Sequence, residues 1–245
     1  MTMPRFYCPP PLHASAKFDL PQAAAHHASR VLRLRVNDEV RVFDGLGNEL
    51  YGRICEIEGK RVALEKLQVC TVSRESPLNI VLAQALSSSE KMDWVIQKAT
   101  ELGATEIQPV QTQRGMTKLA GERAEKRTQH WHGVTIAACE QCGRNILPKV
   151  HAPLEFSAWI AAMGDTPGSK FILLPESLTT LHEQPKPQGK ATLLIGPEGG
   201  FSTDEVRLAE QVGFVSVRLG ARLLRTETAA VAGIAALQTL WGDFI

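Results

Sequence analysis

Three short turns in the last third of the chain hold most of the residues that could do chemistry. Each follows an apolar run typical of a buried strand, and the turns are Leu174–Glu176, Ile195–Phe201 and Leu219–Ala229. In an open α/β sheet, ligands bind outside the carboxyl ends of the strands. The middle turn is rich in glycine, which leaves the backbone bare for close approach of a ligand. The spacing therefore predicts a ligand pocket formed by these turns.

The middle turn, Gly196-Pro-Glu-Gly-Gly-Phe-Ser202, leads directly into a helix start. Ser202 and Glu205 have the spacing of a capping box, in which each side chain satisfies a free backbone amide of the first turn. The chain has no G-K-[ST] loop and no G-x-G-x-x-G fingerprint, which disfavours a nucleoside triphosphate or a dinucleotide. Taken alone, the glycines are equally compatible with a tight connection between two elements.

The region that positions these turns alternates apolar strands with helices, which indicates a parallel sheet covered by helices. Ser87 and Glu90 predict a second capping box, ahead of a helix with an apolar stripe from Met92 to Leu102. Gly103 is the expected stop of that helix. A long helix is expected from about Gly121 to Cys142.

The N-terminal part has a different residue pattern. Short alternating runs over residues 39–44, 49–57 and 61–65, separated by glycine turns, predict a small β-barrel. A short helix over residues 22–32 ends in three arginines, Arg30, Arg33 and Arg35, which are either solvated charges or phosphate contacts. The polar stretch Ser73–Pro77 is an expected linker. The predicted domains are thus residues 1–72 and 73–245.

The final helix, expected over Ala229–Trp241, has few charges on any side. Such a helix must be buried, either in the core or against a second copy of the chain. Because a chain end is hard to cover otherwise, we favour partial burial at a dimer interface.

Composition limits the remaining function classes. With 44% hydrophobic residues the chain can bury a core, and its net charge of +1 neither requires nor excludes nucleic acid. No run reaches the roughly 20 apolar residues of a membrane span, and Met1–Pro11 does not resemble a secretion signal. Five scattered cysteines favour a reducing, cytoplasmic location.

Cys139 and Cys142 have C-x-x-C spacing, which could indicate a metal or redox pair. Zinc needs about four ligands and no second C-x-x-C exists. We therefore expect two small side chains on a helix, and no metal.

The residues also carry a family resemblance. Gly196-Pro-Glu-Gly-Gly-Phe-Ser followed by Leu219-Gly-x-Arg-Leu-Leu-Arg-x-Glu-Thr-Ala resembles the paired C-terminal motifs of the RsmE family, in the SPOUT methyltransferase superfamily. These enzymes methylate N3 of a uridine in 16S ribosomal RNA. The remaining matches are Arg5-Phe, His27-x-x-Arg30-Val-Leu-Arg, Asp44-Gly, Lys91-x5-Gln97-Lys-Ala-x-Glu101-Leu-Gly and Glu140-Gln-x-x-Arg144. The resemblance spans nearly the whole chain.

The resemblance implies an α/β fold with a trefoil knot, an exception to the rule that chains do not thread loops, preceded by a PUA-like RNA-binding β-barrel. It also implies a homodimer and the cofactor S-adenosylmethionine. The implied cofactor-binding residues are Leu174, Glu176, Ile195, Gly196, Gly200, Leu219, Leu224, Thr226, Thr228 and Ala229.

Methylation of uracil N3 needs a proton acceptor and a cation near the flanking carbonyl oxygens. Arg225 is the candidate cation, although it could instead pair with Glu227 or hold an RNA phosphate. Glu198 is a weaker candidate acceptor, because it could equally make a structural hydrogen bond within its own turn. The candidate RNA contacts, each of which could also be a solvated charge, are Arg5, Arg30, Arg33, Lys91, Arg114 and Arg144. On the helix that carries Lys91, pairing of Lys98 with Glu101 is an ordinary structural alternative.

Two other functions remain open. The first keeps the fold but moves the target to a ribose 2′-hydroxyl or another base, in tRNA or large-subunit RNA. The second is an RNA-binding assembly factor without activity. The N-terminal barrel and Glu140-Gln-x-x-Arg144 favour the uridine target, and the intact glycine and Arg-x-Glu-Thr-Ala turns argue against loss of activity.

Overall fold

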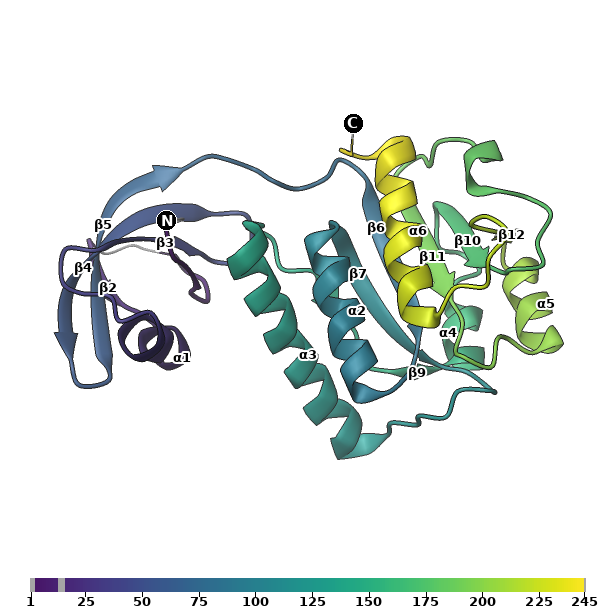
Figure 1. Ribbon diagram of the computed structural model, residues 1–245, viewed down its shortest axis with the longest axis horizontal. Coiled ribbons are helices and arrows are strands. Elements are labelled where there is room, and N and C mark those ends of the chain that lie inside the picture. Colours follow the sequence, from purple (N-terminus) through teal and green to yellow (C-terminus); the bar gives the residue numbers. More distant parts are fainter. Residues whose placement is uncertain (1–2, 13–15, 245) are drawn as a thin grey trace. The chain divides into compact units, whose positions relative to one another are not determined.

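The computed structural model describes residues 3–12 and 16–244 (Figure 1). Its contacts divide the chain into an N-terminal unit, Met1–Glu75 with Ile136–Leu147, and a C-terminal unit, Ser76–Thr135 with Pro148–Ile245. Residues 1, 2, 13–15 and 245 of the two expected domains lie outside the described residues. The sequence did not predict that a later segment would join the N-terminal unit.

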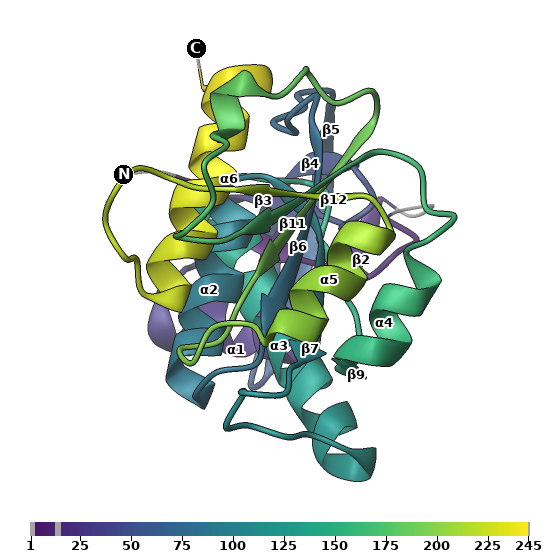
Figure 2. The same ribbon diagram turned by 90° about the vertical axis from the view of Figure 1, so that its right-hand side faces the viewer.

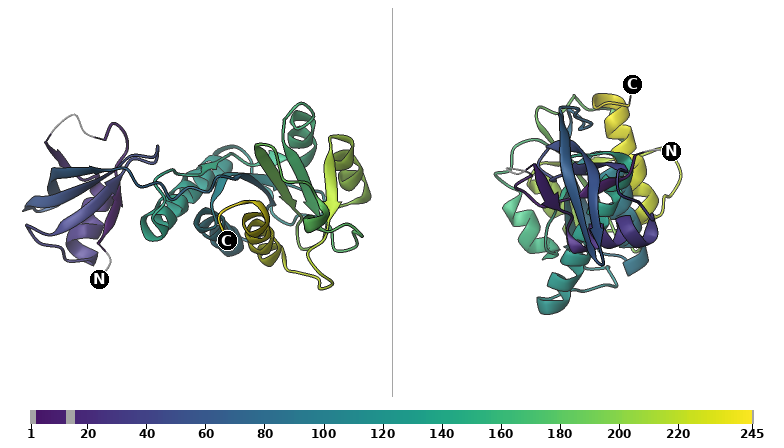
Figure 3. Two further views of the ribbon diagram at one scale, coloured as in Figure 1. Left: turned by 90° about the horizontal axis from the view of Figure 1, so that it is seen from above. Right: turned by 90° about the vertical axis from the view of Figure 1, so that its left-hand side faces the viewer.

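The N-terminal unit contains a five-stranded sheet in the order β1-β3-β4-β5-β2. Its strands are β1 (Arg5–Tyr7), β2 (Lys17–Asp19), β3 (Glu39–Phe43), β4 (Glu49–Glu58) and β5 (Arg61–Cys70). Helix α1 (Gln22–His26) continues into a π-helical turn, His27–Val31, and can be seen below these strands on the left of Figure 3. Three small alanines, Ala24, Ala25 and Ala28, let the helix approach the apolar side of the sheet closely.

Hydrogen bonds explain why Ile136–Leu147 belongs to this unit. The backbone amide of Tyr7 donates to Glu140 Oε1 over 3.0 Å, and Arg5 Nη2 donates to the carbonyl of Arg144 over 2.9 Å. The amide of Leu147 donates to the carbonyl of Gly45 over 3.0 Å. Glu140 is thus a structural acceptor, and its burial raises its pKa although the Tyr7 amide acts in the opposite direction.

The C-terminal unit is built on a parallel sheet in the order β12-β10-β11-β6-β7-β8, with β9 also paired to β7. The strands are β6 (Asn79–Ala85), β7 (Ala104–Gln111), β8 (Lys149–Val150), β9 (Leu154–Glu155), β10 (Ser169–Leu173), β11 (Lys190–Ile195) and β12 (Phe214–Val217). The central strands are near-continuous apolar runs, as expected for a sheet that is covered on both faces. The predicted parallel sheet is confirmed.

Helices cover both faces of this sheet. Figure 2 shows α2 (Ser89–Glu101) beside α6 (Thr226–Trp241) on one face, and α4 (Phe156–Ala162) with α5 (Thr203–Gln211) on the other. Helix α3 (Gly121–Cys142) and a 3₁₀ turn (Leu181–Glu183) complete the regular structure. Gly233 lets α6 lie close to β11, because a Cβ atom there would stand 2.6 Å from a methyl group of Leu193.

A buried lysine links two helices of the second face. Lys170 on β10 is 7% exposed, and its ammonium group donates to the carbonyls of Met163 and Val212 over 2.6 and 2.9 Å. These carbonyls lie at the C-terminal ends of α4 and α5. A cation at a helix C-terminus satisfies carbonyls that have no partner within the helix.

One predicted helix start is wrong by one residue. Helix α2 is capped by Ser88 rather than Ser87, without a side-chain capping bond, and the buried Ser87 hydroxyl has no hydrogen-bond partner. With Ser88 as the cap, the third helical position falls on Lys91, so Glu90 cannot complete a capping box. The stop at Gly103 (φ 86°) and the stripe from Met92 to Leu102 are confirmed.

Among the described residues, none of the helices combines the length and apolar character that a membrane span requires. All five cysteines lie in the described part of the chain and none forms a disulfide. Cys139 and Cys142 lie in the last turn of α3, as expected for small side chains on a helix. A hydrogen bond with Cys142, followed by burial, raises the pKa of the Cys139 thiol.

Candidate functional site

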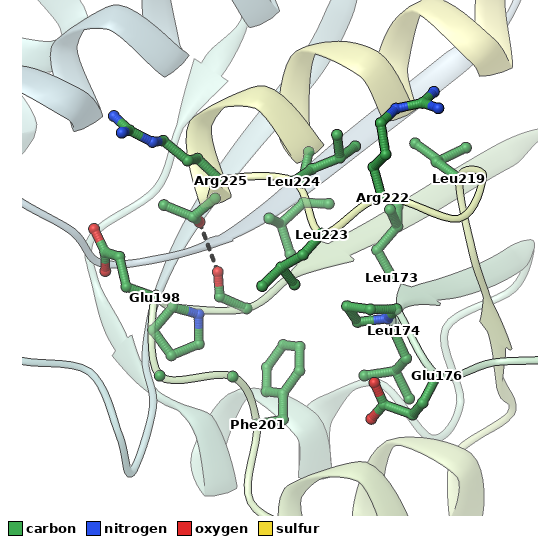
Figure 4. Close-up of a pocket in the computed structure, with 18 of the residues that line it drawn as sticks. Leu173, Leu174, Glu176, Glu198, Phe201, Leu219, Arg222, Leu223, Leu224 and Arg225 are labelled. Atoms are coloured by element: carbon green, nitrogen blue, oxygen red, sulfur yellow. Dashed lines mark hydrogen bonds between the residues drawn. The ribbon is translucent and has the colours of Figure 1, made fainter.

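The three predicted turns meet in one cavity of about 600 Å³, which we call the strand-end pocket (Figure 4). The turns follow β10, β11 and β12, and the first residues of α6 close the pocket. Of the predicted cofactor-binding residues, those that line it are Leu174, Glu176, Ile195, Gly196, Gly200, Leu219, Leu224, Thr226 and Ala229. Thr228 is exposed and does not line it. The three strand-end turns therefore form the cavity, and the cofactor contacts implied by the resemblance, Thr228 included, stay predictions.

The floor of the pocket is fixed by a buried hydrogen-bond chain. Thr226 Oγ1 donates to the carbonyl of Gly196 over 2.6 Å and accepts from Gln84 Nε2 over 2.9 Å. Gln84 lies on β6, is fully buried, and also donates to the carbonyl of Ala85. A polar group buried without a partner would be costly, so this chain holds the glycine turn in one position against α6.

The glycine turn is also held from its other side. The predicted capping box is confirmed: Glu205 accepts from the amide of Ser202, whose hydroxyl accepts from the amide of Glu205. Glu205 additionally accepts from the amide of Gln113 over 2.8 Å. Arg114 donates to the carbonyls of Gly199 and Phe201 over 3.3 and 3.2 Å, a structural role that was not predicted for it. The loop after β7 therefore supports the glycine turn.

The rim of the pocket carries charged side chains from three elements. Lys91 lies on the first turn of α2, and its ammonium nitrogen is 2.9 Å from Glu198 Oε1 and 3.5 Å from Glu227 Oε2. Arg225 caps the N-terminus of α6, is exposed, and forms no salt bridge to any carboxylate that the structure describes. The pairing of Arg225 with Glu227, one of the alternatives for this arginine, is absent from the structure.

The pairing of Glu198 decides its protonation. Burial acts to raise the pKa of this carboxyl, but hydrogen bonds from Lys91 and from its own backbone amide outweigh burial and lower it. The hydrogen bond to Glu198 in turn raises the pKa of Lys91. Both groups are therefore ionised near neutral pH, and Glu198 is a weak proton acceptor.

The arginines predicted to contact RNA fall into two groups in the N-terminal unit. Arg5 is ion-paired with Glu49 and Arg144 with Glu75, and their side chains are only 7% and 4% exposed. Arg30 and Arg33 are exposed, and Arg33 has a left-handed backbone (φ 54°). Burial favours a structural role for the first pair, because their guanidinium groups are not offered to a ligand.

Arg30 also lines a hollow of about 540 Å³ beside α1. The other lining residues, which come from α1, the π-helical turn and the turn between β4 and β5, are Gln22, Ala23, His26, Ser29, Gly59 and Lys60. The ionisable groups in this lining are all basic. A hollow of this composition suits an anion.

Several residues at the site were not predicted from the sequence. Gln84 had a usable signal, because it is a polar residue at the end of an otherwise apolar strand. Glu227 was considered only as a partner of Arg225, and its contact with Lys91 joins elements far apart in the chain. Phe201, Arg222 and Leu223 also line the pocket; they lie in the predicted turns, but only the fold shows that their side chains reach the cavity.

The comparison with family models covers both units. Residues 74–238 match the RNA methyltransferase domain, and residues 20–67 match the RNA methyltransferase PUA domain. Ribosomal RNA small subunit methyltransferase E of Buchnera aphidicola is 33% identical, over 99% of this chain and 95% of its own length. The chain belongs to the RsmE family of RNA methyltransferases.

Solved RsmE-type structures agree over the full length. The enzyme of this name from Neisseria gonorrhoeae, bound to S-adenosyl methionine, is 41% identical with a TM-score of 0.92, covering 99% of this chain and all of the other. A methyltransferase of Legionella pneumophila in complex with the same cofactor is 37% identical with a TM-score of 0.94, covering 100% of both chains. The predicted RsmE resemblance and the PUA-like plus parallel-sheet architecture are confirmed.

Proposed function

We propose that this RsmE-family protein transfers a methyl group from S-adenosylmethionine to N3 of a uridine in 16S ribosomal RNA of the small subunit. The observation that carries the proposal is the strand-end pocket, which lies wholly within the matched methyltransferase domain. The relatives with this name cover nearly the whole chain. The absence of disulfides suits a cytoplasmic location.

The pocket fits S-adenosylmethionine in size and lining. Its volume of about 600 Å³ lies within the range of roughly 300–1,000 Å³ for small-molecule sites. Leucine and isoleucine side chains from the three strand ends offer an apolar surface for an adenine ring, with Gly196 and Gly200 exposing backbone groups beside it. Glu176 supplies a carboxylate at the rim for the polar parts of the cofactor. When bound, the cofactor supplies an electrophilic methyl group.

We assign the cationic role at the uracil to Arg225. Uracil N3 is a poor nucleophile until it loses its proton, and the resulting negative charge spreads over the two neighbouring carbonyl oxygens. A guanidinium group can donate two parallel hydrogen bonds to such oxygens. Because Glu198 is a weak base in its pair with Lys91, we assign the N3 proton to bulk solvent rather than to Glu198.

The RNA must present this uridine unpaired or flipped out, since N3 lies on the Watson–Crick edge. We propose that Arg30, Lys60 and Arg33 hold RNA phosphates on the N-terminal unit, because Arg30 and Lys60 line the basic hollow and Arg33 is an exposed cation three residues after Arg30. Lys91 and Arg114 already have partners within the pocket, and Arg5 and Arg144 are buried.

We also propose that the protein acts as a homodimer and that the chain passes through the trefoil knot of its superfamily. The buried face of α6 packs on the sheet, whereas Val231, Ala232 and Ala235 are only half-buried and Leu240 on the same helix is 40% exposed. An apolar strip left partly open is suited to a second copy of the chain. Sedimentation analysis of the purified protein tests the dimer.

The activity is tested by methyl transfer from radiolabelled S-adenosylmethionine to unmodified small ribosomal subunits, followed by mass analysis of the nucleosides. We expect 3-methyluridine in 16S RNA, and loss of that nucleoside in RNA from a deletion strain. A methylated ribose or another base would move the target within the same fold. Absence of cofactor binding in calorimetry at millimolar concentration would instead indicate an assembly factor.

A further inference from the structure

Lys91 is unusual among the charged residues of the C-terminal unit because two carboxylates from distant segments share it. Its ammonium group contacts Glu198, in the turn after β11, and Glu227, in the first turn of α6. The side chains of Lys91 and Glu198 are 32% and 48% exposed, whereas Glu227 is only 17% exposed. One cation therefore donates a hydrogen bond to Glu198 and lies 3.5 Å from a buried oxygen of Glu227, which has no hydrogen-bond partner of its own among the described residues.

Arg225 lies at the same rim of the pocket and forms no salt bridge with a described carboxylate. It precedes Glu227 by two residues, and in Figure 4 its side chain extends to the same side of the pocket as that of Glu198. An arginine close to a free carboxylate forms a hydrogen-bonded pair with it readily. Arg225 has no such partner among the described residues, and Lys91 lies within 4 Å of both Glu198 and Glu227.

We propose that Lys91 is a positioning residue for methyl transfer, which engages Glu198 and Glu227 and thereby keeps the guanidinium group of Arg225 available for the uracil carbonyl oxygens. The inference rests on the function proposed above. It replaces an RNA phosphate contact, the role that the sequence suggested for Lys91, with an electrostatic role inside the pocket.

The geometry supports this role over two others. A lysine that bound RNA phosphate would have to leave two carboxylates, one of them mostly buried, without a partner, which is unfavourable. A lysine that acted as a base would need a lowered pKa, whereas contact with Glu198 raises it. Lys91 is thus a permanent cation, and its effect passes through the carboxylates that it holds.

The first test measures the availability of Arg225 directly, without cofactor or RNA. A dicarbonyl reagent specific for guanidinium groups is applied to the full-length protein, and modification of Arg225 is followed by peptide mass mapping. In Lys91→Met we expect a several-fold slower modification, because the released carboxylates pair with Arg225. In Lys91→Met with Glu198→Gln and Glu227→Gln we expect the rate to return. An unchanged rate in Lys91→Met overturns the proposal.

The second test measures turnover on unmodified small subunits. Coupling within one charge network is commonly worth a factor of several to about a hundred, and we expect kcat to fall about tenfold in Lys91→Met, with cofactor affinity by calorimetry unchanged within about twofold. Lys91→Arg should retain most of the turnover. The triple variant should recover part of what Lys91→Met loses, and failure to recover indicates that Lys91 acts directly.

Lys98→Met is the matched control, because Lys98 lies on the same helix and pairs with Glu101 outside the pocket. It should change neither the modification of Arg225 nor turnover. If the wild-type protein forms no 3-methyluridine, the proposed function fails, whereas the modification experiment still judges the link between Lys91 and Arg225.

Discussion

The floor and the rim of the strand-end pocket are built in opposite ways. The floor consists of buried groups with fixed hydrogen bonds, as in the chain from Gln84 through Thr226 to Gly196. The rim consists of partly or fully exposed charges, Lys91, Glu198 and Arg225, whose interactions are weakened by solvent. A rigid floor suits binding of one small molecule, and an adjustable rim suits contact with charge that develops during reaction. Floor variants should therefore change cofactor affinity and stability, and rim variants should change turnover.

The largest expected effect lies at the rim. Replacement of Arg225 by alanine should lower kcat by about a hundred- to a thousandfold, the usual consequence of removing one donor from a developing negative charge. Cofactor affinity should stay within about twofold, because the side chain of Arg225 belongs to the rim rather than to the apolar floor. Steady-state methyl transfer and calorimetry on the same preparation measure the two quantities.

Arg222→Ala is the control for this experiment, since Arg222 lines the same pocket on the same turn but extends to another side in Figure 4. Arg222→Ala should lower kcat far less than Arg225→Ala does. An Arg225→Ala variant with a wild-type rate, or one that loses affinity and turnover equally, would break the division between floor and rim.

The next effect lies in the floor. Thr226→Val keeps the shape of the side chain but removes both the acceptor for Gln84 and the donor for Gly196. The loss of partners for buried polar groups should lower the free energy of unfolding by about 1–3 kcal/mol. The released glycine turn should also weaken cofactor binding several-fold, with kcat at saturating cofactor nearly unchanged. Denaturant unfolding and calorimetry measure both.

Thr228→Val provides the comparison for this variant. Thr228 lies on the same turn of α6, but it is exposed and outside the pocket. It should alter neither stability nor affinity measurably. A loss of cofactor affinity in Thr228→Val would instead restore the cofactor role that the sequence implied for this residue.

A third variant tests Arg114, which lines the pocket and also supports the glycine turn. Arg114→Met removes the hydrogen bonds to the carbonyls of Gly199 and Phe201, and each ordinary hydrogen bond contributes about 0.5–1.5 kcal/mol. We expect cofactor affinity to fall by a factor of about two to ten. If Arg114 contacted RNA phosphate instead, cofactor affinity would hold, and the salt dependence of RNA binding would become less steep.

The sequence predicted the strands, the helices and the location of the pocket better than it predicted which side chains pair with one another. The strands before residues 174, 195 and 219, the bounds of α3 and the capping box at Ser202 all follow from local patterns. Local patterns could also place a pocket, because parallel strands end at one edge of a sheet. The helix start at Ser87 failed because three consecutive serines offer equivalent caps, and packing selects between them.

The partners of charged side chains could not be predicted in the same way. Arg5 and Arg144 match motif positions, but their ion pairs with Glu49 and Glu75 join residues 44 and 69 positions apart in the chain. The contact of Lys91 with Glu198 spans 107 positions. Composition and spacing show that a charged side chain is present. Only the fold shows whether that side chain already pairs with one of opposite charge. The cofactor residues, the knot and the dimer remain predictions from the family motifs.

The smallest expected effect concerns Glu198 and the dependence of turnover on pH. Hydrogen bonds from Lys91 and from its own amide, opposed by burial, hold the pKa of Glu198 below its ordinary value of 4.5. A carboxyl with a lowered pKa stays ionised at neutral pH, so its pair with Lys91 persists and is lost only as the pH falls through that lowered value. Between pH 6 and 9, roughly, Glu198 does not titrate. Glu198→Gln should therefore leave the shape of the kcat profile unchanged over this range and lower its height no more than a few-fold, because Lys91 still pairs with Glu227 and no carboxylate is released to pair with Arg225. A proton acceptor, by contrast, contributes about a hundred- to ten-thousandfold, and a loss of that size in Glu198→Gln would return the role of base to this residue and make the rim a catalytic acid–base site.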